Sequence, residues 1–325
     1  MCWMRLLGIG LLIVAGCSSS EDVSTSPPAP KDAADASIKS SDVASTPEQA
    51  KTPTTRTAEV PSADGVVIRY EVRGENENAE QPTLVFIHGW CCNRTFWEPQ
   101  LAHFAKRFQV VAVDLAGHGK SDAGRENWTM EAFGQDVAAV VNDVGADRVI
   151  LVGHSMGGPV ILEAADILGD KVAGLIPVDA FTDPNESYTE GQMAEFRKPF
   201  EDDFPTAMHD ALHHEHDFFS EATSEELKER ITNVMTSAPP NMGVGAFQGM
   251  LDFANERQRP LMAKVKVPFV CINAKRIQEK VDDGKQHAPQ FEVVTLPDSG
   301  HFLMMEHPKE FNALLEQTVA EIDIE

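Results

Sequence analysis

Short apolar runs alternate with amphipathic stretches along most of the chain, and this alternation predicts strands separated by helices. The runs are rich in β-branched residues, as are the strands of a buried parallel sheet. Two early runs, 56–60 and 66–72, are joined through Asp64-Gly65 and predict an antiparallel hairpin. The later runs fall at 83–88, 110–114, 149–153, 172–178, 267–272 and 292–296. We therefore expect an α/β fold with a mostly parallel eight-stranded sheet, connected by crossover helices.

Helical periodicity is clearest from Thr129 to Val144, where Thr129 precedes the first apolar residue and is a suitable N-cap. The apolar residues at helical spacing are Met130, Phe133, Val137, Val140, Val141 and Val144. A last helix is expected from about Pro308, and the residues on its buried face are Phe311, Leu314, Leu315 and Val319. Both segments are expected to cover the sheet.

The most informative pattern is Gly153-His154-Ser155-Met156-Gly157, which lies between a predicted strand and a predicted helix at 160–168. This G-x-S-x-G pattern is typical of a nucleophile elbow, a strained turn that presents the serine hydroxyl at the edge of a sheet. The glycines avoid collisions across so tight a turn. The start of the helix directs free N–H groups toward a carbonyl oxygen that becomes negative. Ser155 is therefore the candidate nucleophile, and the alternative is a glycine-rich turn without a catalytic role.

Three further segments extend this pattern. They are the strand that ends in His88-Gly89-Trp90, the strand 110–114 with the loop Gly117-His118-Gly119, and the strand 291–296 with Gly300-His301-Phe302 and Glu306-His307-Pro308. Together with the serine motif, these segments resemble the α/β-hydrolase superfamily over about residues 56 to 323, least closely between 181 and 262. The resemblance implies the α/β-hydrolase fold.

Between Phe181 and Arg259 the strand–helix alternation gives way to an acidic, helix-prone segment. Members of the superfamily insert a helical cap after the sixth strand. The resemblance thus implies a core over 56–180, a cap over 181–262 and the rest of the core over 263–325. The aromatic and methionine residues that are candidates to face the pocket are Phe196, Phe200, Phe204, Met208, Phe218, Phe219, Met242, Phe247 and Met250. The alternative for each is packing of the cap helices on the core.

A serine hydroxyl needs a base, and the base needs a carboxylate that fixes its tautomer. His301 matches the position of the superfamily's base. The usual acid position follows the seventh strand, where this chain has Asn273-Ala274-Lys275-Arg276-Ile277 and no carboxylate. Some members, including a branch of the haloalkane dehalogenases and certain lipases, carry the acid at the end of the sixth strand, which is the position of Asp179. We expect Asp179 to be the acid, with Asp282 or Asp283 as the alternative.

The resemblance also assigns the oxyanion hole, the backbone donors that stabilise a tetrahedral intermediate. By position, these donors are the N–H groups of Trp90 and Met156. The positions of His88 and His118 are structural in the superfamily, and His154 is expected to point away from the serine.

Composition excludes several classes of function. The chain has 325 residues and a formal net charge of −24, so it offers no basic surface to nucleic acid or to anionic lipid. The residues His209, His213, His214 and His216 have a spacing that could bind metal on a helix, but the glutamate of His-Glu-x-x-His is missing and a solvated helix is the alternative. We expect neither a metal nor a cofactor. The remaining cysteines, Cys91, Cys92 and Cys271, are expected to be free thiols.

The first segment carries a targeting signal. One arginine precedes an apolar stretch, 6–15, that is too short to span a bilayer. It closes on Val14-Ala15-Gly16-Cys17, which resembles the bacterial lipobox, and an ordinary secretory signal is the alternative. We expect a signal peptide over 1–16, a lipidated Cys17 and a disordered tether over 17–55, because that segment has few large apolar residues. The protein is thus expected to be exported and lipid-anchored, outer membrane or periplasmic face, with this anchor as its only membrane contact.

These observations lead to one functional hypothesis and its competitors. The hypothesis is a serine hydrolase, an esterase that acts on small or medium esters through an acyl-enzyme. Cofactor-free perhydrolysis of the haloperoxidase type and carbon–carbon bond hydrolysis remain alternatives on the same triad, because fold does not rank them. A non-catalytic ligand-binding protein on the same scaffold is the alternative of another class. The sequence leaves the oligomeric state open.

Overall fold

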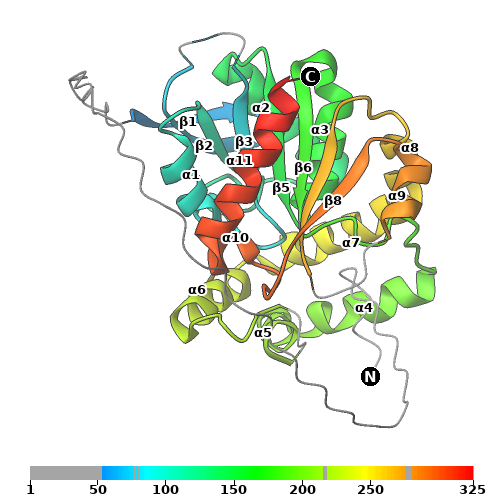
Figure 1. The fold of residues 1–325 in the computed structure, drawn as a ribbon. Helices are drawn as coiled ribbons and strands as arrows, with labels where there is room; N and C mark the ends of the chain where they lie inside the picture. Colours follow the sequence, from blue (N-terminus) through cyan, green and yellow to red (C-terminus); the bar gives the residue numbers. More distant parts are fainter. Residues whose placement is uncertain (1–52, 77, 79–80, 215–217, 276–279, 325) are drawn as a thin grey trace, which may run out of the picture. The chain divides into compact units, whose positions relative to one another are not determined.

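The computed structural model describes residues 53–324 except 77, 79–80, 215–217 and 276–279 (Figure 1). The predicted signal peptide, Cys17 and most of the predicted tether lie outside the described residues, as does His216. Among the helices that are described, none has the length and apolarity needed to cross a membrane.

The core is the predicted eight-stranded sheet, in the order β1-β2-β4-β3-β5-β6-β7-β8. The β1–β2 and β2–β4 pairs are antiparallel and the remaining pairs are parallel. The strands are β1 Thr55–Pro61, β2 Val67–Arg73, β3 Thr83–Ile87, β4 Val110–Asp114, β5 Val149–His154, β6 Val172–Val178, β7 Phe269–Ala274 and β8 Phe291–Leu296. Both faces of the central strands are buried, which explains their continuous apolar runs. The fold class predicted from the sequence is confirmed.

One strand lies two residues later than the sequence predicts. The apolar run suggests 267–272, but β7 spans Phe269–Ala274. Pro268 has no N–H to donate to a neighbouring strand, and its carbonyl accepts a hydrogen bond from Leu175 at 2.9 Å. Pairing with β8 continues to Asn273, opposite Thr295, and to Ala274. Asn273 therefore belongs to the end of the strand and not to the following loop, which matters for the site.

Helices cover both faces of the sheet (Figure 1). Helices α1 and α11 pack together on one face, and α2 and α3 pack together on the other. Their bounds are α1 Glu98–Phe104, α2 Met130–Val144, α3 Gly157–Leu168 and α11 Pro308–Ile324, with the short elements η1 Arg94–Trp97, η2 Gly169–Lys171, α9 Val281–His287 and α10 Leu303–Glu306. Thr129 caps α2 as predicted, since its hydroxyl accepts a hydrogen bond from the N–H of Ala132 at 3.1 Å.

The described residues between β6 and β7 form five helices, in the range that the sequence assigns to the cap. They are α4 Glu190–Asp202, α5 Phe204–His214, α6 Glu225–Thr236, α7 Pro240–Glu256 and α8 Gln258–Met262. Figure 1 shows α4 to α7 gathered at one end of the sheet. Aromatic rings join them to the core, because Trp90 contacts Phe200, Phe204 and Phe247 with ring centroids 5.1 to 6.0 Å apart.

Candidate active site

Ser155 lies in a sharp turn between β5 and α3, with a left-handed φ of 53°. Its N–H donates to the carbonyl of Val178 at 2.9 Å, which ties the turn to the end of β6. A Cβ at Gly153 would lie 2.2 Å from the carbonyl oxygen of Gly157, and a Cβ at Gly157 would lie 2.7 Å from that of Ile87. Both glycines are therefore required by close backbone approach, and the strained turn has the geometry of a nucleophile elbow.

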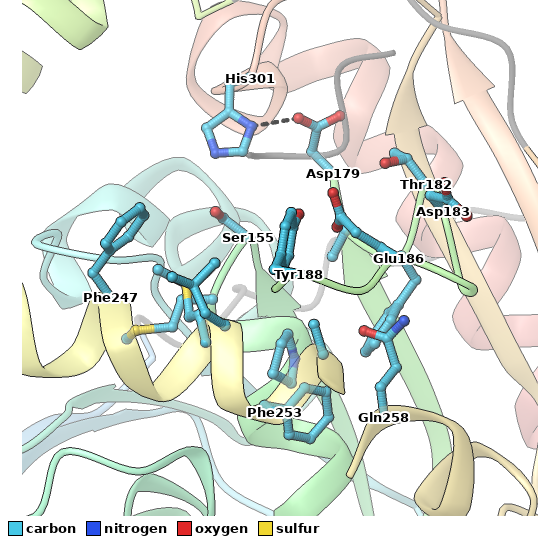
Figure 2. A pocket seen from close by; sticks show the side chains of 17 residues that line it. Ser155, Asp179, Thr182, Asp183, Glu186, Tyr188, Phe247, Phe253, Gln258 and His301 are labelled. Atoms are coloured by element: carbon cyan, nitrogen blue, oxygen red, sulfur yellow. Dashed lines mark hydrogen bonds and ion pairs between the residues drawn. The ribbon is translucent and has the colours of Figure 1, made fainter. Parts of the chain in front are cut away.

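His301 and Asp179 are brought together from the ends of β8 and β6. The Nδ1 atom of His301 is hydrogen bonded to Oδ2 of Asp179, and both residues are buried. Figure 2 shows the side chains of His301 and Ser155 facing the same space, with Asp179 beside the histidine. A carboxylate on Nδ1 fixes the tautomer in which Nε2 is free to accept a proton.

The end of β7 holds Asp179 in place. Asp179 has a left-handed φ of 50°, and its N–H donates to the carbonyl of Ile272 at 3.1 Å. The N–H of Ala274 donates to Oδ1 of Asp179 at 3.0 Å. The fully buried side chain of Asn273 donates to the carbonyl of Ala180 at 3.1 Å and accepts from the N–H of Ala180 at 3.2 Å. Strand β7, which is not followed by the expected carboxylate, thus holds in place the carboxylate that follows the neighbouring strand β6.

Sequence reasoning missed this role of Asn273. In the sequence, Asn273 is notable only because a carboxylate is expected after the seventh strand and none is present. The available signal was a polar amide at the end of an otherwise apolar strand, next to a strand that ends in an aspartate. A buried amide that satisfies both backbone groups of one residue restricts that residue to a single conformation.

Three contacts hold the loop of His301. Its N–H donates to the carbonyl of Phe218 in the cap at 2.9 Å, and its own carbonyl accepts from Nε2 of His154 at 2.8 Å. Oε2 of Glu306 accepts from the N–H of Gly300 at 2.9 Å. Burial, together with the neighbouring His301 ring, lowers the pKa of His154 to about 3, so His154 is neutral at pH 7. His154 supports the backbone of the candidate base.

The two backbone donors assigned to an oxyanion hole are available. Met156 is the N-cap of α3, directly after Ser155, and Trp90 follows β3. Within the described part of the chain, no acceptor is hydrogen bonded to the N–H of Trp90 or of Met156. The Trp90 indole N–H donates to the carbonyl of Gly243 in α7 at 2.8 Å, so a cap contact fixes this residue.

His88 and His118 use both ring nitrogens on backbone groups. His88 donates from Nδ1 to the carbonyl of Gly89 at 2.8 Å and accepts at Nε2 from the N–H of Leu115 at 3.1 Å. His118 donates to the carbonyl of Ala116 at 2.9 Å and accepts from the N–H of Cys91 at 3.2 Å. Burial lowers the pKa of His88 to about 4 and that of His118 to about 3. Both are structural, as expected.

The other titratable candidates lie apart from this arrangement. Asp282 and Asp283 are in the first turn of α9 and do not line the cavity described below. Cys91, Cys92 and Cys271 are free and buried, as predicted. Burial raises the pKa of the Cys91 and Cys92 thiols, so neither is a thiolate at neutral pH. His213 hydrogen bonds Thr232 at 2.9 Å.

A cavity of about 100 Å³ joins Ser155, Asp179 and His301. Its apolar wall comes largely from α7, and its polar wall from the segment after β6. Of the nine cap residues proposed to face a pocket, Phe247 and Met250 line it. The remaining lining residues are Met156, Pro159, Ala180, Phe181, Thr182, Asp183, Glu186, Tyr188, Leu251, Phe253, Ala254 and Gln258.

Comparison with known proteins identifies the family of the chain. The model of the alpha/beta hydrolase family matches residues 84–314. The chain belongs to this family. The hydrolase is similar to the AB hydrolase superfamily protein YisY of Bacillus subtilis (strain 168), with 28% identity over 249 residues, 72% of this chain and 90% of that protein.

Solved structures share the hydrolase fold. An esterase from Thermogutta terrifontis superposes with a TM-score of 0.70 at 23% identity, over 82% of this chain and 99% of that one. A bromoperoxidase from Bacillus anthracis gives a TM-score of 0.70 at 20% identity, over 82% of this chain and 100% of that one. At these identities the likeness establishes the fold of the hydrolase and leaves its reaction to the site.

Proposed function

We propose that this hydrolase is a serine carboxylesterase that acts on small or medium esters through an acyl-enzyme. The observation that carries the proposal is the hydrogen bond from His301 to Asp179 in a cavity that Ser155 also lines. Nucleophile, base and carboxylate come from the ends of three strands of one rigid sheet, which keeps their geometry fixed.

The reaction follows from these positions. Nε2 of His301 takes the hydroxyl proton of Ser155 as Oγ forms a bond to the acyl carbon. The negative oxygen of the tetrahedral intermediate accepts from the N–H groups of Trp90 and Met156, and such donors are worth about 10²–10³ in turnover each. The intermediate expels the alcohol, which takes the proton from Nε2 as the carbon–oxygen bond breaks. A water molecule then gives a proton to Nε2 and its oxygen attacks the acyl carbon, which releases the acid and returns the proton to Ser155.

A fluorophosphonate probe tests the nucleophile, because it forms a stable bond only with an activated serine. We expect stoichiometric labelling at Ser155, with loss of labelling in Ser155→Ala and His301→Ala. A hydrolysis screen with p-nitrophenyl esters of increasing chain length tests the substrate class, and the small cavity favours short acyl chains. Folded protein that neither reacts with the probe nor hydrolyses any ester would contradict the proposal and favour a ligand-binding protein.

Perhydrolysis is a second candidate, in which hydrogen peroxide replaces water as the acceptor of the acyl group. One comparison favours it: a bifunctional esterase/perhydrolase from Acinetobacter calcoaceticus is 37% identical over 123 residues, 37% of this chain and 44% of that protein. Peracid formation measured beside ester hydrolysis separates the two acceptors. Absence of peracid at millimolar peroxide would contradict perhydrolysis.

We also propose export and lipid anchoring through Cys17, on the basis of the lipobox-like sequence Val14-Ala15-Gly16-Cys17. The Cys17→Ala variant of the full chain is expected to leave washed membranes and to appear in the soluble fraction. Ester hydrolysis by the released variant should equal that of the wild type. Retention of the variant in membranes would contradict the anchor.

A further inference from the structure

The cavity beside Ser155 has two unlike walls. Helix α7 contributes Phe247, Met250, Leu251 and Phe253, which suit the apolar part of a substrate. The segment after β6 contributes Thr182, Asp183, Glu186 and Tyr188, which line the same space (Figure 2). Figure 2 shows Glu186 beside Tyr188, on the side of the cavity where Asp179 lies. A substrate that fills this space meets an apolar surface on one side and a carboxylate on the other.

The charges of this cavity are not balanced. The described residues that line it include three carboxylates, those of Asp179, Asp183 and Glu186, but no lysine and no arginine. Asp179 is hydrogen bonded to His301, and Asp183 forms an ion pair with Lys280. Glu186 forms no ion pair within the described part of the chain. Among the described residues that line the cavity, Glu186 is thus a carboxylate without an ion pair, and a cationic ligand would compensate its charge.

We propose that Glu186 and Tyr188 form a subsite for a cationic ammonium group, so that the preferred substrates are esters that carry such a group near the scissile bond. The proposal rests on the proposed ester hydrolysis and names its substrate class. A carboxylate attracts the cation directly, and the face of an aromatic ring adds a cation–π contact. The formal charge of −24 steers cations toward the protein and disfavours anionic substrates.

The protonation of Glu186 gives the subsite a pH dependence. The pKa of Glu186 is raised to about 7: burial is the main cause and the charge of Asp183 adds to it, while the Tyr188 hydroxyl and Lys280 act in the opposite direction. Below pH 7 the carboxyl is mostly neutral and attracts a cation weakly; above pH 7 it is charged and attracts a cation strongly. Asp179 and His301 face the same cavity, but their effect on the chemistry is common to any two esters of one acid. The ratio between two such esters therefore reports the charges near the alcohol group, and the Glu186→Gln variant distinguishes Glu186 from Asp183, which lines the same cavity.

The test compares two butyrate esters of equal shape, the 2-(trimethylammonio)ethyl ester and its carbon isostere, the 3,3-dimethylbutyl ester. The charge of the first ester is fixed at every pH. We expect kcat/KM of the wild type to favour the charged ester at pH 8 and to favour it less at pH 6. Glu186→Gln should lower the ratio at pH 8 on the order of tenfold to 100-fold and abolish its pH dependence, because the electrostatic attraction between the carboxylate and the trimethylammonium group is lost. Glu190→Gln, which removes an exposed carboxylate from α4, is the matched control and should keep the wild-type ratio.

Equal ratios in the wild type and in Glu186→Gln would overturn the subsite. Absence of hydrolysis of both esters and of p-nitrophenyl acetate would instead overturn the proposed esterase, and binding then decides the subsite. For that purpose, calorimetry measures the affinity of the charged ester for Ser155→Ala and for Ser155→Ala/Glu186→Gln. Weaker binding to the double variant supports the subsite, and equal binding contradicts it.

Discussion

Histidines occupy two regions of the sheet edge where the parallel strands end, and they differ in what their ring nitrogens contact. His88 and His118, after β3 and β4, each use both nitrogens on backbone groups. His301, after β8, places Nδ1 on the carboxylate of Asp179, and the histidine lines the cavity. The first two rings are fixed and neutral. The comparison shows that buried histidines at one edge of the sheet differ in their partners: backbone groups for His88 and His118, and a carboxylate for His301.

The carboxylate in this comparison depends on two neighbouring strand ends. Asp179 closes β6 and supplies the charge, whereas Asn273 near the end of β7 supplies an amide that holds the next residue. The donor from Ala274 and the acceptor at Ile272 also belong to β7. Residues of β7, the strand that the acid usually follows in the superfamily, therefore hold in place a carboxylate that follows the neighbouring strand β6.

The largest expected effect comes from removing the charge of Asp179, the partner that distinguishes His301 from His88 and His118. Asp179→Asn should lower kcat for p-nitrophenyl butyrate by about 10⁴, because an amide neither fixes the tautomer nor stabilises the imidazolium. Turnover of the folded variant is the measurement, with circular dichroism to establish that the fold is retained.

Asp282→Asn and Asp283→Asn are the matched controls for this experiment. Each removes a carboxylate from the first turn of α9, outside the cavity. Both should retain turnover close to that of the wild type, because surface substitutions of this kind change the free energy of unfolding by about 0.5 kcal/mol or less and leave the cavity intact. Turnover of Asp179→Asn within tenfold of the wild type, together with a loss in either control, would return the acid to the loop after β7.

An intermediate effect is expected from Asn273, which acts through Asp179 as a positioning residue. Asn273→Ala removes both hydrogen bonds to Ala180 and loosens the carboxylate next to it. We expect kcat and the rate of fluorophosphonate labelling to fall together by roughly tenfold to 100-fold with little change in KM, since misplaced catalytic groups reduce turnover steeply. Asn273→Asp, which keeps the acceptor for the Ala180 N–H, should recover part of the loss.

A second buried amide, outside the cavity, provides a control that distinguishes a positioning role of Asn273 from a contribution to stability alone. Asn312 on α11 accepts a hydrogen bond from Gln100 at 2.9 Å and does not line the cavity. Asn312→Ala should lower the melting temperature as Asn273→Ala does, while its labelling rate equals that of the wild type. If both variants lose stability and neither loses labelling, Asn273 has only a structural role.

The same comparison separates what the sequence predicts from what it does not. The alternation of apolar runs and helical patterns predicted the mostly parallel eight-stranded sheet, and motifs at strand ends predicted the serine turn and the pairing of Asp179 with His301. The position of β7 was wrong by two residues because the predicted strand included Pro268, which has no N–H to donate to a neighbouring strand. Asn273 and Glu186 were missed because their roles depend on segments distant in the sequence or on the cavity. The cap aromatics Phe200 and Phe204 pack against Trp90, and only tertiary structure distinguishes that packing from a pocket wall.

The smallest effect concerns the structural histidines and appears in stability, not in turnover. The folded protein holds the pKa of His88 at about 4 and those of His118 and His154 at about 3, against 6.5 for an ordinary histidine. Between these values the unfolded chain binds more protons than the folded one, so the free energy of unfolding falls as the pH decreases from 6.5 toward 4. Each histidine contributes a slope of up to about 1.4 kcal/mol per pH unit. His118→Gln should be less stable at pH 7, because it disturbs two hydrogen bonds, yet lose less stability on acidification, because glutamine does not titrate. Urea denaturation at pH 7, 6, 5 and 4 measures both quantities, and an acid slope equal to that of the wild type would assign the acid sensitivity to other groups.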